Sequence, residues 1–494
     1  MKGNLAVARI VVLGLVLINS VSLVRADTAT GQMIADSIVT GDSMGITLDE
    51  AITIALREHG DVGAAEQNYY SAVEGITSAR SSLYPQVTAD FNYTYQNGNR
   101  RMTSNSSASF DSSDFTSGIS VTQNIFDGGR IRATVRGAKS SALNAMGAVG
   151  TARNSLAYTV ATAFYGQLLD EKLVTQRQGE VELAQQQLEM IQAQVEAGTV
   201  ARSDVQSVQV NLSQAQFDLV TAQNNLKVSQ TKLRQTMGLE RGPALNLQEP
   251  GLTEDIAPVA ASEQDKSTFT LPALPPLPAV PPLKSLDEYL TQARQLRPDL
   301  LQANANVDQS KAQLSLAKIA QRPQVSVSAG YDIDPFHAQN RGLTFGAGVS
   351  IPIFDGGGRK ADERGAEDAL KASEIRLSQL QKDVAADVEE TYISVSGETQ
   401  RIQNARALVE AARTNFATAS EKYQLGLGIV LDVVNAQTQL FSAQTSLTQA
   451  LYDYQLALAD LDRAVGRFAW VNPGVTPPTE APSTLPETIA VSNK

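Results

Sequence analysis

Cysteine is absent from this chain of 494 residues, and histidine and tryptophan are nearly absent, with two residues and one residue. Without cysteine the chain forms no disulfide and carries no acylated cysteine, so its stability must come from packing or assembly. His59 and His337 share no motif or spacing, which argues against a metal site. The G-x-G-x-x-G and P-loop signatures are missing as well. We therefore expect neither an enzyme nor a cofactor.

Long apolar runs are scarce too, and the one that stands out lies at the N-terminus. Lys2 and Arg9 lead into an apolar run from Ile10 to Val24, and a small residue, Ala26, follows. This pattern is typical of a secretory signal peptide covering residues 1–26. No other run reaches the roughly 18 apolar residues of a membrane-spanning helix. The segment holds three basic and no acidic residues, so its removal takes the net charge from −12 to −15. Such an acidic balance argues against nucleic acid as a partner.

Prolines are unevenly distributed along the chain. None lies between Pro85 and Pro243, or between Pro352 and Pro473. A proline-rich linker covers residues 243–283, and a proline-rich tail covers residues 468–494. Segments of this composition act as extended spacers. The linker separates a first part, residues 46–242, from a second part, residues 284–467.

These two parts are copies of one another. Motifs that precede the first Pro-Gln-Val share an offset of 238 residues with their second copies, and motifs that follow it share an offset of 228. The matched pairs are Leu48-Asp49-Glu50 with Leu286-Asp287-Glu288, Pro85-Gln86-Val87 with Pro323-Gln324-Val325, Phe126-Asp127-Gly128-Gly129 with Phe354-Asp355-Gly356-Gly357, Gly198 with Gly426, and Asp204 with Asp432. A repeat this long is not a solenoid period. We interpret it as a duplicated supersecondary unit.

The stretches without proline are predicted to be helical. Apolar residues recur at alternating spacings of three and four along residues 205–233 and, more regularly, along residues 433–464, which is the heptad pattern of a coiled coil. Each copy has a matching seam upstream of a glycine, Gly198 or Gly426, and glycine allows the positive φ that ends a helix. Each copy is therefore predicted to form an antiparallel helical hairpin, at about 131–237 and about 360–465. The first helix of the first copy would be on the order of 100 Å long.

Two pairs of short segments have the period of β-strands instead. Apolar and polar residues alternate along residues 87–96, 115–126, 325–333 and 343–351. Their length and pattern are typical of membrane-crossing strands. We therefore expect strand pairs at about 86–126 and about 324–354. The polar, serine-rich residues 97–114 are predicted to be the exposed loop of the first pair, and this loop holds the ten residues by which the copies differ in length.

Four strands cannot close a barrel, and an open sheet edge in lipid leaves backbone groups without hydrogen bonds. Several chains must therefore share one barrel. Two chains would give eight strands, whose interior is filled by side chains. Three chains would give twelve strands with a water-filled lumen. The sequence thus predicts a mainly α-helical protein with a membrane β-barrel, in which each chain supplies four transmembrane strands and a homotrimer completes a 12-stranded barrel.

This combination of features resembles the outer membrane factor family, the TolC-like outer membrane efflux proteins. The resemblance covers nearly all of residues 46–467. It rests on the duplicated unit, on both Phe-Asp-Gly-Gly motifs and on the segment Tyr423-Gln-Leu-Gly-Leu-Gly-Ile-Val-Leu-Asp-Val-Val-Asn435. It implies a homotrimer whose barrel lies in outer membrane lipid and whose helices form an α-helical barrel in the periplasm. Members are exit ducts of tripartite efflux or type I secretion systems, and they dock a periplasmic adaptor (membrane fusion protein) and an inner-membrane transporter.

The resemblance also implies a constriction at the periplasmic mouth. Asp432 matches a residue of an acidic ring, and Asn435 stands one turn further on, where some members carry a second aspartate. Tyr423 and Asp204 match positions that join neighbouring helices at the closed mouth. Because the barrel anchors the other end of the long helices, we expect the adaptor to dock at the hairpin turns, which contain Gly198, Thr199, Gly426 and Leu427.

Other interpretations of these residues stay open. Asp204 and Asp432 both follow a turn at the start of a helix, where capping and the helix dipole favour aspartate. Tyr423 is equally compatible with a position in the helical seam. The Phe-Asp-Gly-Gly motifs are expected to turn the chain from strand to helix, with glycine freeing the backbone.

Two other classes of protein also share parts of this pattern. A trimeric surface adhesin combines a shared barrel with a coiled coil, but it would place one barrel-forming stretch at the C-terminus. A structural periplasmic coiled-coil protein with a membrane anchor is the other alternative. An adaptor of that kind would need a lipoyl-like β domain between its helices. Because the strands occur in two separated pairs, the sequence favours the duct.

Overall fold

The computed structural model describes residues 45–103, 106–198, 200–242, 245–248, 283–333 and 342–470. These residues fall into two compact units. In the small unit, Ile46 forms a parallel bridge with Leu247, and the Ile46 N–H donates to the Asn246 carbonyl oxygen at 2.9 Å. All named helices and strands belong to the large unit. The expected signal peptide and most of the proline-rich linker and tail lie outside the described residues.

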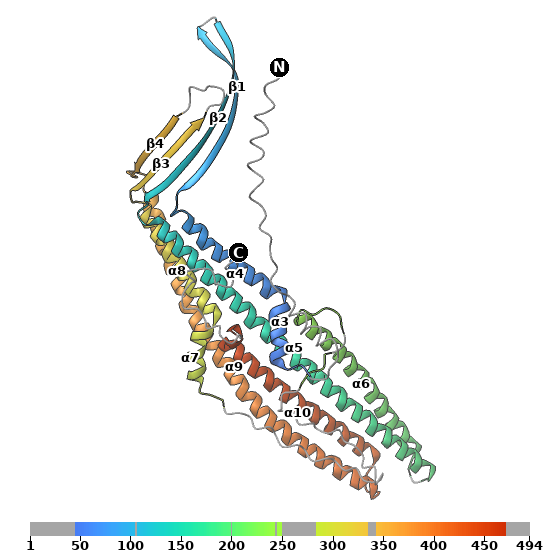
Figure 1. Ribbon diagram of the computed structural model, residues 1–494. Coiled ribbons are helices and arrows are strands. Elements are labelled where there is room, and N and C mark those ends of the chain that lie inside the picture. Colours follow the sequence, from blue (N-terminus) through green and yellow to red (C-terminus); the bar gives the residue numbers. More distant parts are fainter. Residues whose placement is uncertain are drawn as a thin grey trace, which may run out of the picture. The chain divides into compact units, whose positions relative to one another are not determined.

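The large unit repeats one order of elements twice, with two shorter helices, two strands, a long helix and a further helix (Figure 1). The first copy consists of α3 (Leu48–Glu58), α4 (Gly60–Ser81), β1 (Gln86–Thr103), β2 (Ser106–Phe126), α5 (Arg130–Glu196) and α6 (Arg202–Thr236). The second consists of α7 (Leu286–Leu296), α8 (Pro298–Ile319), β3 (Gln324–Ile333), β4 (Gly342–Ser350), α9 (Gly358–Gln424) and α10 (Val430–Val465), followed by the 3₁₀ helix η1 (Arg467–Trp470). The prediction of a mainly helical chain is therefore confirmed.

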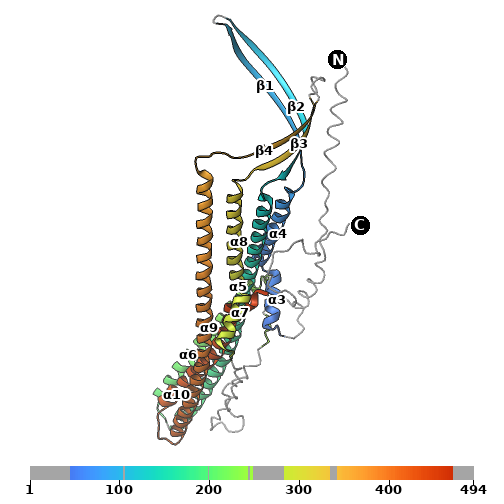
Figure 2. The same ribbon diagram turned by 90° about the vertical axis from the view of Figure 1, so that its left-hand side faces the viewer.

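The long helices change neighbours along their length. α5 and α9 have 67 residues each, which corresponds to about 100 Å. Near the strands the helices contact one another in the order α4, α5, α8, α9 (Figure 2). Towards the hairpin turns the order is α6, α5, α10, α9 (Figure 1). None of the helices in the described ranges is both long and apolar enough to cross a membrane.

The heptad seam of α10 forms much of the core. Every position of the predicted seam is buried, and large residues alternate with small ones: Val433, Ala436, Leu440, Ala443, Leu447, Ala450, Tyr454, Ala457, Leu461 and Ala464. On α9, Val409, Ala412 and Phe416 pack into the same cluster. The small residues let the two helix backbones approach, and the large ones fill the space between them.

The four strands form one antiparallel sheet in the order β1-β2-β3-β4. Pairing of β2 with β3 joins the two copies. The register places apolar residues opposite one another on one face; Val121, for example, lies between Val87 and Ala329. Several side chains of this face are more than half exposed, namely Val87, Phe91, Tyr93, Ile119, Leu343, Phe345 and Val349. Serine, threonine and glycine dominate the opposite face, so the sheet is two-faced as its alternation predicts.

The first strand pair is longer than predicted. β1 and β2 pair from Gln86 with Thr122 to Thr103 with Ser106, so most of the predicted loop at residues 97–114 is a paired ribbon. The loop prediction was wrong because it relied on side-chain polarity. The hydrogen bonds of an antiparallel pair join backbone groups and do not require apolar side chains. β3 and β4 have 10 and 9 residues, and β4 ends at Ser350, before the expected boundary near 354.

Both Phe-Asp-Gly-Gly motifs have the structural role that the sequence predicts. The second glycine of each motif is left-handed, with φ of 97° and 91°. Asp127 accepts hydrogen bonds from the Gly129 N–H at 2.8 Å and from the Ile131 N–H at 2.6 Å. Asp355 makes the same two bonds, at 3.0 and 2.8 Å. Backbone donors at Arg359 and the second glycine lower the pKa of Asp355. Each aspartate thus binds the otherwise unpaired N–H groups that begin a long helix.

An ionic cluster joins the two copies midway along the helices. Arg297, between α7 and α8, binds Asp387 of α9 at 2.5 Å and Asp299 at 2.8 Å. Arg463 of α10 binds Asp387 at 3.1 Å, and its guanidinium lies 5.5 Å from the ring centre of Tyr158 on α5. Partial burial alone would raise the pKa of Asp387, but the hydrogen bonds and charges of Arg297 and Arg463 outweigh it and lower this pKa.

The helix η1 extends the same junction. The Trp470 Nε1–H donates to the Leu296 carbonyl oxygen at 2.7 Å, and Arg467 donates to Gln292 at 2.9 Å. Residues 468–470, which the sequence assigns to the tail, therefore belong to the second copy.

We predict that Asp387→Asn lowers the free energy of unfolding by about 1–2 kcal/mol at pH 7, because it leaves two guanidinium groups without their shared carboxylate in a half-buried site. The folded-state pKa of Asp387 lies below the unfolded value of about 3.9, so its contribution is complete above that pH and is lost as the pH falls further. Thermal unfolding followed by circular dichroism should show a deficit that shrinks on acidification. Asp368→Asn, at an exposed pair on the same helix, is the control. A deficit of equal size at pH 7 and pH 3 would contradict the role of the charge.

Candidate functional site

The predicted site residues lie at the turns of the two helical hairpins. Gly198 and Gly426 both have positive φ, 74° and 71°. The Gly426 N–H donates to the Tyr423 carbonyl oxygen at 3.0 Å, and the Leu427 N–H donates to that of Lys422 at 2.8 Å. A Cβ atom added at either glycine would meet open space, so the backbone conformation, and not crowding, requires glycine here. Thr199 lies outside the described residues.

The ends of the two hairpins pack against each other. Ile191 of α5, Val208 of α6 and Val430 of α10 are buried in one apolar cluster, and Tyr423 and Val434 pack against it. The cluster therefore holds residues from all four helices that meet at these turns.

Tyr423 links α9 to α5 within this cluster. Its hydroxyl donates to Gln194 Oε1 at 2.7 Å. Partial burial raises the pKa of Tyr423, and the negative charge of Asp204 adds to the effect. Tyr423 is therefore within electrostatic reach of Asp204, but the hydrogen bond of the phenol goes to Gln194. The Asp204 carboxylate accepts from Ser203 Oγ at 3.3 Å.

Asp432 and Asn435 are both exposed, one helical turn apart in α10. The N-cap residues of α6 and α10 are Ala201 and Ile429, and neither helix begins with a side-chain capping hydrogen bond. The interpretation of the aspartates as hydrogen-bonded caps is therefore wrong, although both stay in a first turn, where the helix dipole favours a negative charge. Among the residues that the structure describes, the Asp432 side chain forms no hydrogen bond or ion pair.

The structure contains a second, polar seam between α5 and α10, which the sequence analysis did not predict. Gln187 and Gln437 are both buried, and neither amide has a hydrogen-bond partner within the described ranges. Further from the turns, Gln176 donates to the Thr448 hydroxyl at 2.6 Å. Near the turns α5 packs mainly against α6 and α10, and α10 packs mainly against α9 and α5. The apolar spacing reveals only one seam for each helix. The other seam contains glutamine, which a search for apolar periodicity passes over.

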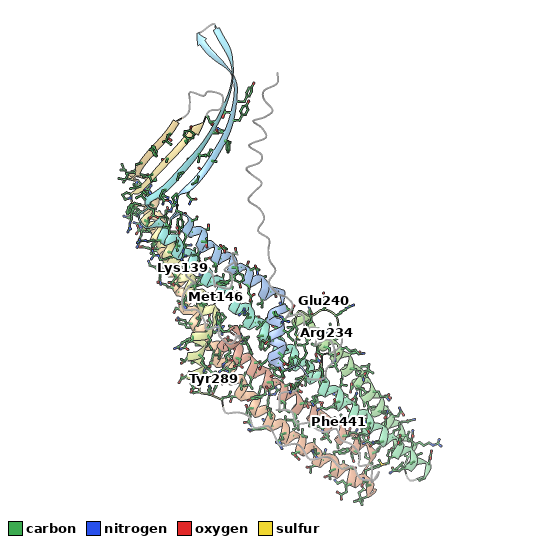
Figure 3. All side chains as sticks on the ribbon, in the orientation of Figure 1. Lys139, Met146, Arg234, Glu240, Tyr289 and Phe441 are labelled. Atoms are coloured by element: carbon green, nitrogen blue, oxygen red, sulfur yellow. The ribbon has the colours of Figure 1, made fainter. Side chains whose placement is uncertain are left out.

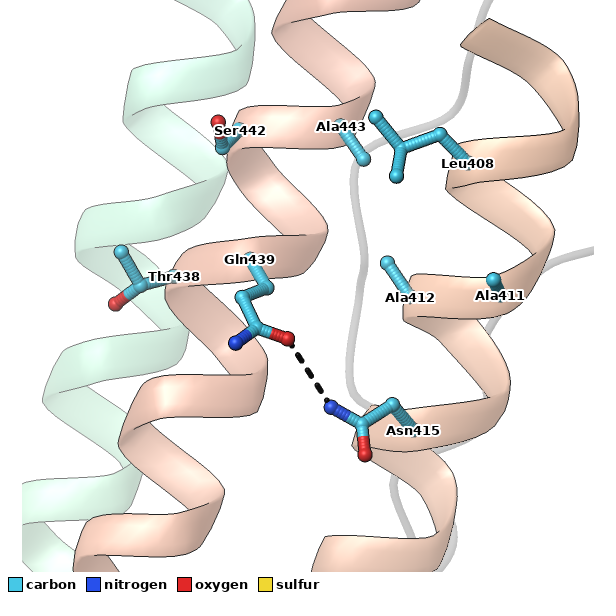
Figure 4. A pocket seen from close by; sticks show the side chains of 8 residues that line it. All are labelled: Leu408, Ala411, Ala412, Asn415, Thr438, Gln439, Ser442 and Ala443. Atoms are coloured by element: carbon cyan, nitrogen blue, oxygen red, sulfur yellow. Dashed lines mark hydrogen bonds between the residues drawn. The ribbon is translucent and has the colours of Figure 1, made fainter. Parts of the chain in front are cut away.

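An open groove of about 560 Å³ runs between α9 and α10 above the turn. It is lined by Leu408, Ala411, Ala412 and Asn415 from α9 and by Thr438, Gln439, Ser442 and Ala443 from α10 (Figure 4). The Asn415 amide donates to Gln439 across it at 3.2 Å. Most of these side chains are small, so the groove is a surface on which another helix can lie closely. In the described part of the chain, no three carboxylate or imidazole side chains are grouped as metal ligands.

A two-faced sheet joined to two long helical hairpins defines the class of outer membrane channels with periplasmic helices. The chain shares this fold with VceC, an outer membrane protein of Vibrio cholerae, with a TM-score of 0.66 and 17% identity over 85% of this chain and 96% of VceC. The outer membrane protein TolC of Escherichia coli is 26% identical over 80% of this chain and 77% of TolC. The alkaline protease secretion protein AprF of Pseudomonas aeruginosa is 22% identical over 85% of this chain and 84% of AprF.

The family described as "Outer membrane efflux protein" matches residues 51–239 and 289–467, one match for each copy of the repeat. The chain belongs to this family. Its place is the outer membrane, and its helices extend into the periplasm. The resemblance seen in the sequence is confirmed.

We predict that Tyr423→Phe loosens the junction of the hairpin ends. The variant loses one hydrogen bond, which contributes about 0.5–1.5 kcal/mol, so amide hydrogen exchange in the last turn of α9 should accelerate roughly two- to twelvefold. Tyr454→Phe is the matched control, because the Tyr454 hydroxyl is buried without a hydrogen-bond partner among the described residues. Equal exchange in the two variants would contradict a specific role for the bond to Gln194.

Proposed function

We propose that three copies of this chain form the exit duct of a tripartite efflux or type I secretion system in the outer membrane. The duct passively conducts small molecules or polypeptides from a periplasmic adaptor and an inner-membrane transporter to the exterior. The observation that carries this proposal is a four-stranded sheet, apolar on one face and polar on the other, at one end of helices of 67 residues. A surface adhesin is disfavoured, because the strands come in two pairs separated by long helices.

The trimer follows from the edges of the sheet. In the described residues, β1 and β4 are the edge strands of each chain. An edge in lipid leaves N–H and C=O groups unpaired, so β4 of one chain pairs with β1 of the next. Three chains give a 12-stranded barrel with a lumen, whereas eight strands would leave only enough room for side chains. The apolar face meets lipid, and the face with serine, threonine and glycine lines the lumen.

We expect native mass spectrometry of the protein in mild detergent to show a trimer, because fewer chains leave open edges in the membrane. Planar-bilayer recordings of the same sample should show a water-filled conductance, which tests the duct itself. A heat-dissociated sample provides the monomer reference. A stable dimer, or a conducting monomer, would overturn the architecture.

The hairpin turns are the docking end for the adaptor. In the second turn, Leu425, Leu427 and Ile429 are 66%, 77% and 60% exposed. A group of exposed large apolar side chains is typical of a surface that binds another protein. They lie at the opposite end of α9 from the strands. The first turn, with Gly198 and Thr199, and the second turn, with Gly426 and Leu427, together present this surface. The groove between α9 and α10 extends it towards the membrane.

Asp432 and Asn435 form the constriction at this end, and Tyr423 and Asp204 hold neighbouring helices there in the closed state. Three copies of Asp432 around a threefold axis form a ring of carboxylates. In a narrow aqueous pore with protein walls, the field of such a ring is screened less than in bulk water. The exposed, unpaired Asp432 carboxylate supports this assignment.

We predict that Asp432→Ala reduces the cation preference of the pore and weakens its block by divalent and trivalent cations. Because Asn435 is uncharged, this one substitution should remove most of the effect. Asp368→Ala, an exposed acidic residue far from the turn, serves as the control in planar-bilayer recordings. A role in the helix dipole alone gives a different result, a stability loss of about 0.3–1 kcal/mol with selectivity unchanged. Equal selectivity and block in wild type and Asp432→Ala would remove Asp432 from the constriction.

A further inference from the structure

Basic residues are concentrated at the strand end of α5. The first ten positions of this helix carry Arg130, Arg132, Arg136 and Lys139 and no acidic residue. The next thirty positions carry one charged residue, Arg153, which is paired with Glu66 at 2.6 Å. Figure 3 shows Lys139 in the part of α5 that lies towards the strands. Within the described residues, none of the four basic side chains forms an ion pair.

Three of these residues share one face of α5, and we call Arg132, Arg136 and Lys139 the basic stripe. At about 100° per residue they fall within a sector of about 60°. Arg132 and Arg136 are exposed, and Lys139 is partly exposed. A positive charge in the first turn of a helix opposes the helix dipole. Helix stability therefore does not account for the stripe.

The contacts of α5 show which way the stripe faces. Ala138 and Ala142 pack against α4. Gly137 lies against Ala312 of α8, and Asn144 donates to Asn306 of α8 at 2.9 Å. Viewed along the axis of α5, the direction towards α4 and the direction towards α8 are separated by a sector of about 130° on one side and a sector of about 230° on the other. The basic stripe lies near the middle of the wider sector, which is the outer side when helices close into a ring.

The level of the stripe coincides with the end of the strands. Phe126 ends β2, and Phe354 lies four residues beyond the end of β4. They are 53% and 89% exposed, as expected for aromatic residues at a membrane interface. With a rise of 1.5 Å per residue, Arg132 lies about 3 Å and Lys139 roughly 14 Å beyond the start of α5. Long basic side chains at these depths reach the layer of lipid headgroups.

The second copy repeats part of the pattern. At the offset of 228 residues, Lys360 and Arg364 of α9 stand where Arg132 and Arg136 stand in α5. Both are exposed, and neither forms an ion pair among the residues that the structure describes. The third position differs, because Glu367 replaces Lys139 and lies 3.4 Å from Lys318. The first copy therefore has the stronger of two related basic surfaces.

We propose that the basic stripe, assisted by Lys360 and Arg364, binds the phosphate-bearing headgroups of anionic phospholipids on the periplasmic side of the outer membrane. Charge complementarity supports the proposal, because the outward row of cations, which forms no ion pair within the described residues, lies at the height of an anionic surface. This contact fixes the depth of the barrel in the membrane at its periplasmic edge. It rests on the outer membrane placement of the proposed duct and on its closed ring of helices, and it is independent of the constriction at the far end.

Native mass spectrometry of the full-length protein tests this proposal. The protein is transferred from detergent micelles that contain equal amounts of phosphatidylglycerol and phosphatidylethanolamine, and the retained lipids are counted. The wild type should retain more phosphatidylglycerol than phosphatidylethanolamine. In R132Q/R136Q/K139Q the ratio of the two retained lipids should be about tenfold lower. Two controls should keep the wild-type ratio. R132K/R136K conserves the charge, and R202Q/K227Q/K232Q removes three exposed charges from α6, away from the strands. Raising NaCl to 0.5 M should weaken the wild-type preference.

An unchanged lipid preference in R132Q/R136Q/K139Q would overturn the proposal, and so would an equal loss in the α6 control. Displacement of the lipid by equimolar inorganic phosphate would show an anion site and not a lipid surface, and would also overturn it. Bilayer conductance of each variant confirms that the duct is intact. Loss of conductance in the wild type would instead contradict the proposed function and would leave the lipid counts interpretable.

Discussion

The unpaired backbone along β1 and β4 is the constraint on which the rest of the molecule depends. A sheet of four strands has two open edges, and hydrocarbon offers no water to satisfy them. A chain of this kind is therefore incomplete on its own. In the proposed trimer, closure of the barrel sets the helices that leave each strand pair side by side around the same axis. The Phe-Asp-Gly-Gly turns make this possible, because they redirect the chain from strand to helix within a few residues.

The parts of the fold that could be predicted from the sequence are those in which one periodicity dominates. The seam of α10 is visible because its apolar residues recur at one regular spacing, and all of its positions are buried. Residues 97–114 were misinterpreted because antiparallel pairing depends on backbone groups, to which side-chain polarity is a poor guide. The seam between α5 and α10 was missed because buried glutamines such as Gln187 and Gln437 interrupt the apolar pattern.

The candidate site was predictable only in part, for a related reason. Tyr423 and Asp204 were selected by resemblance, and the structure shows only an electrostatic influence of Asp204 on Tyr423. Gln194, which accepts the hydrogen bond of Tyr423, belongs to no motif and lies 229 residues away in the sequence. At the matching position of the other copy stands Lys422, so the repeat gives no hint either. The proposed role of Asp432 depends on copies of itself around an axis, which one chain does not contain.

The inexact duplication has a consequence for symmetry. In the proposed trimer, three chains with two similar halves would place six hairpins around the axis, an arrangement close to sixfold rotation. The halves differ where it matters for contact, since Val195 occupies the position of Tyr423 and Ser207 that of Asn435. A ring of six identical partner molecules therefore meets two kinds of surface in alternation, whereas a ring of three meets the same surface at every subunit. In the proposed trimer, the differences between the two halves of one chain thus decide how many partner molecules find equivalent surfaces.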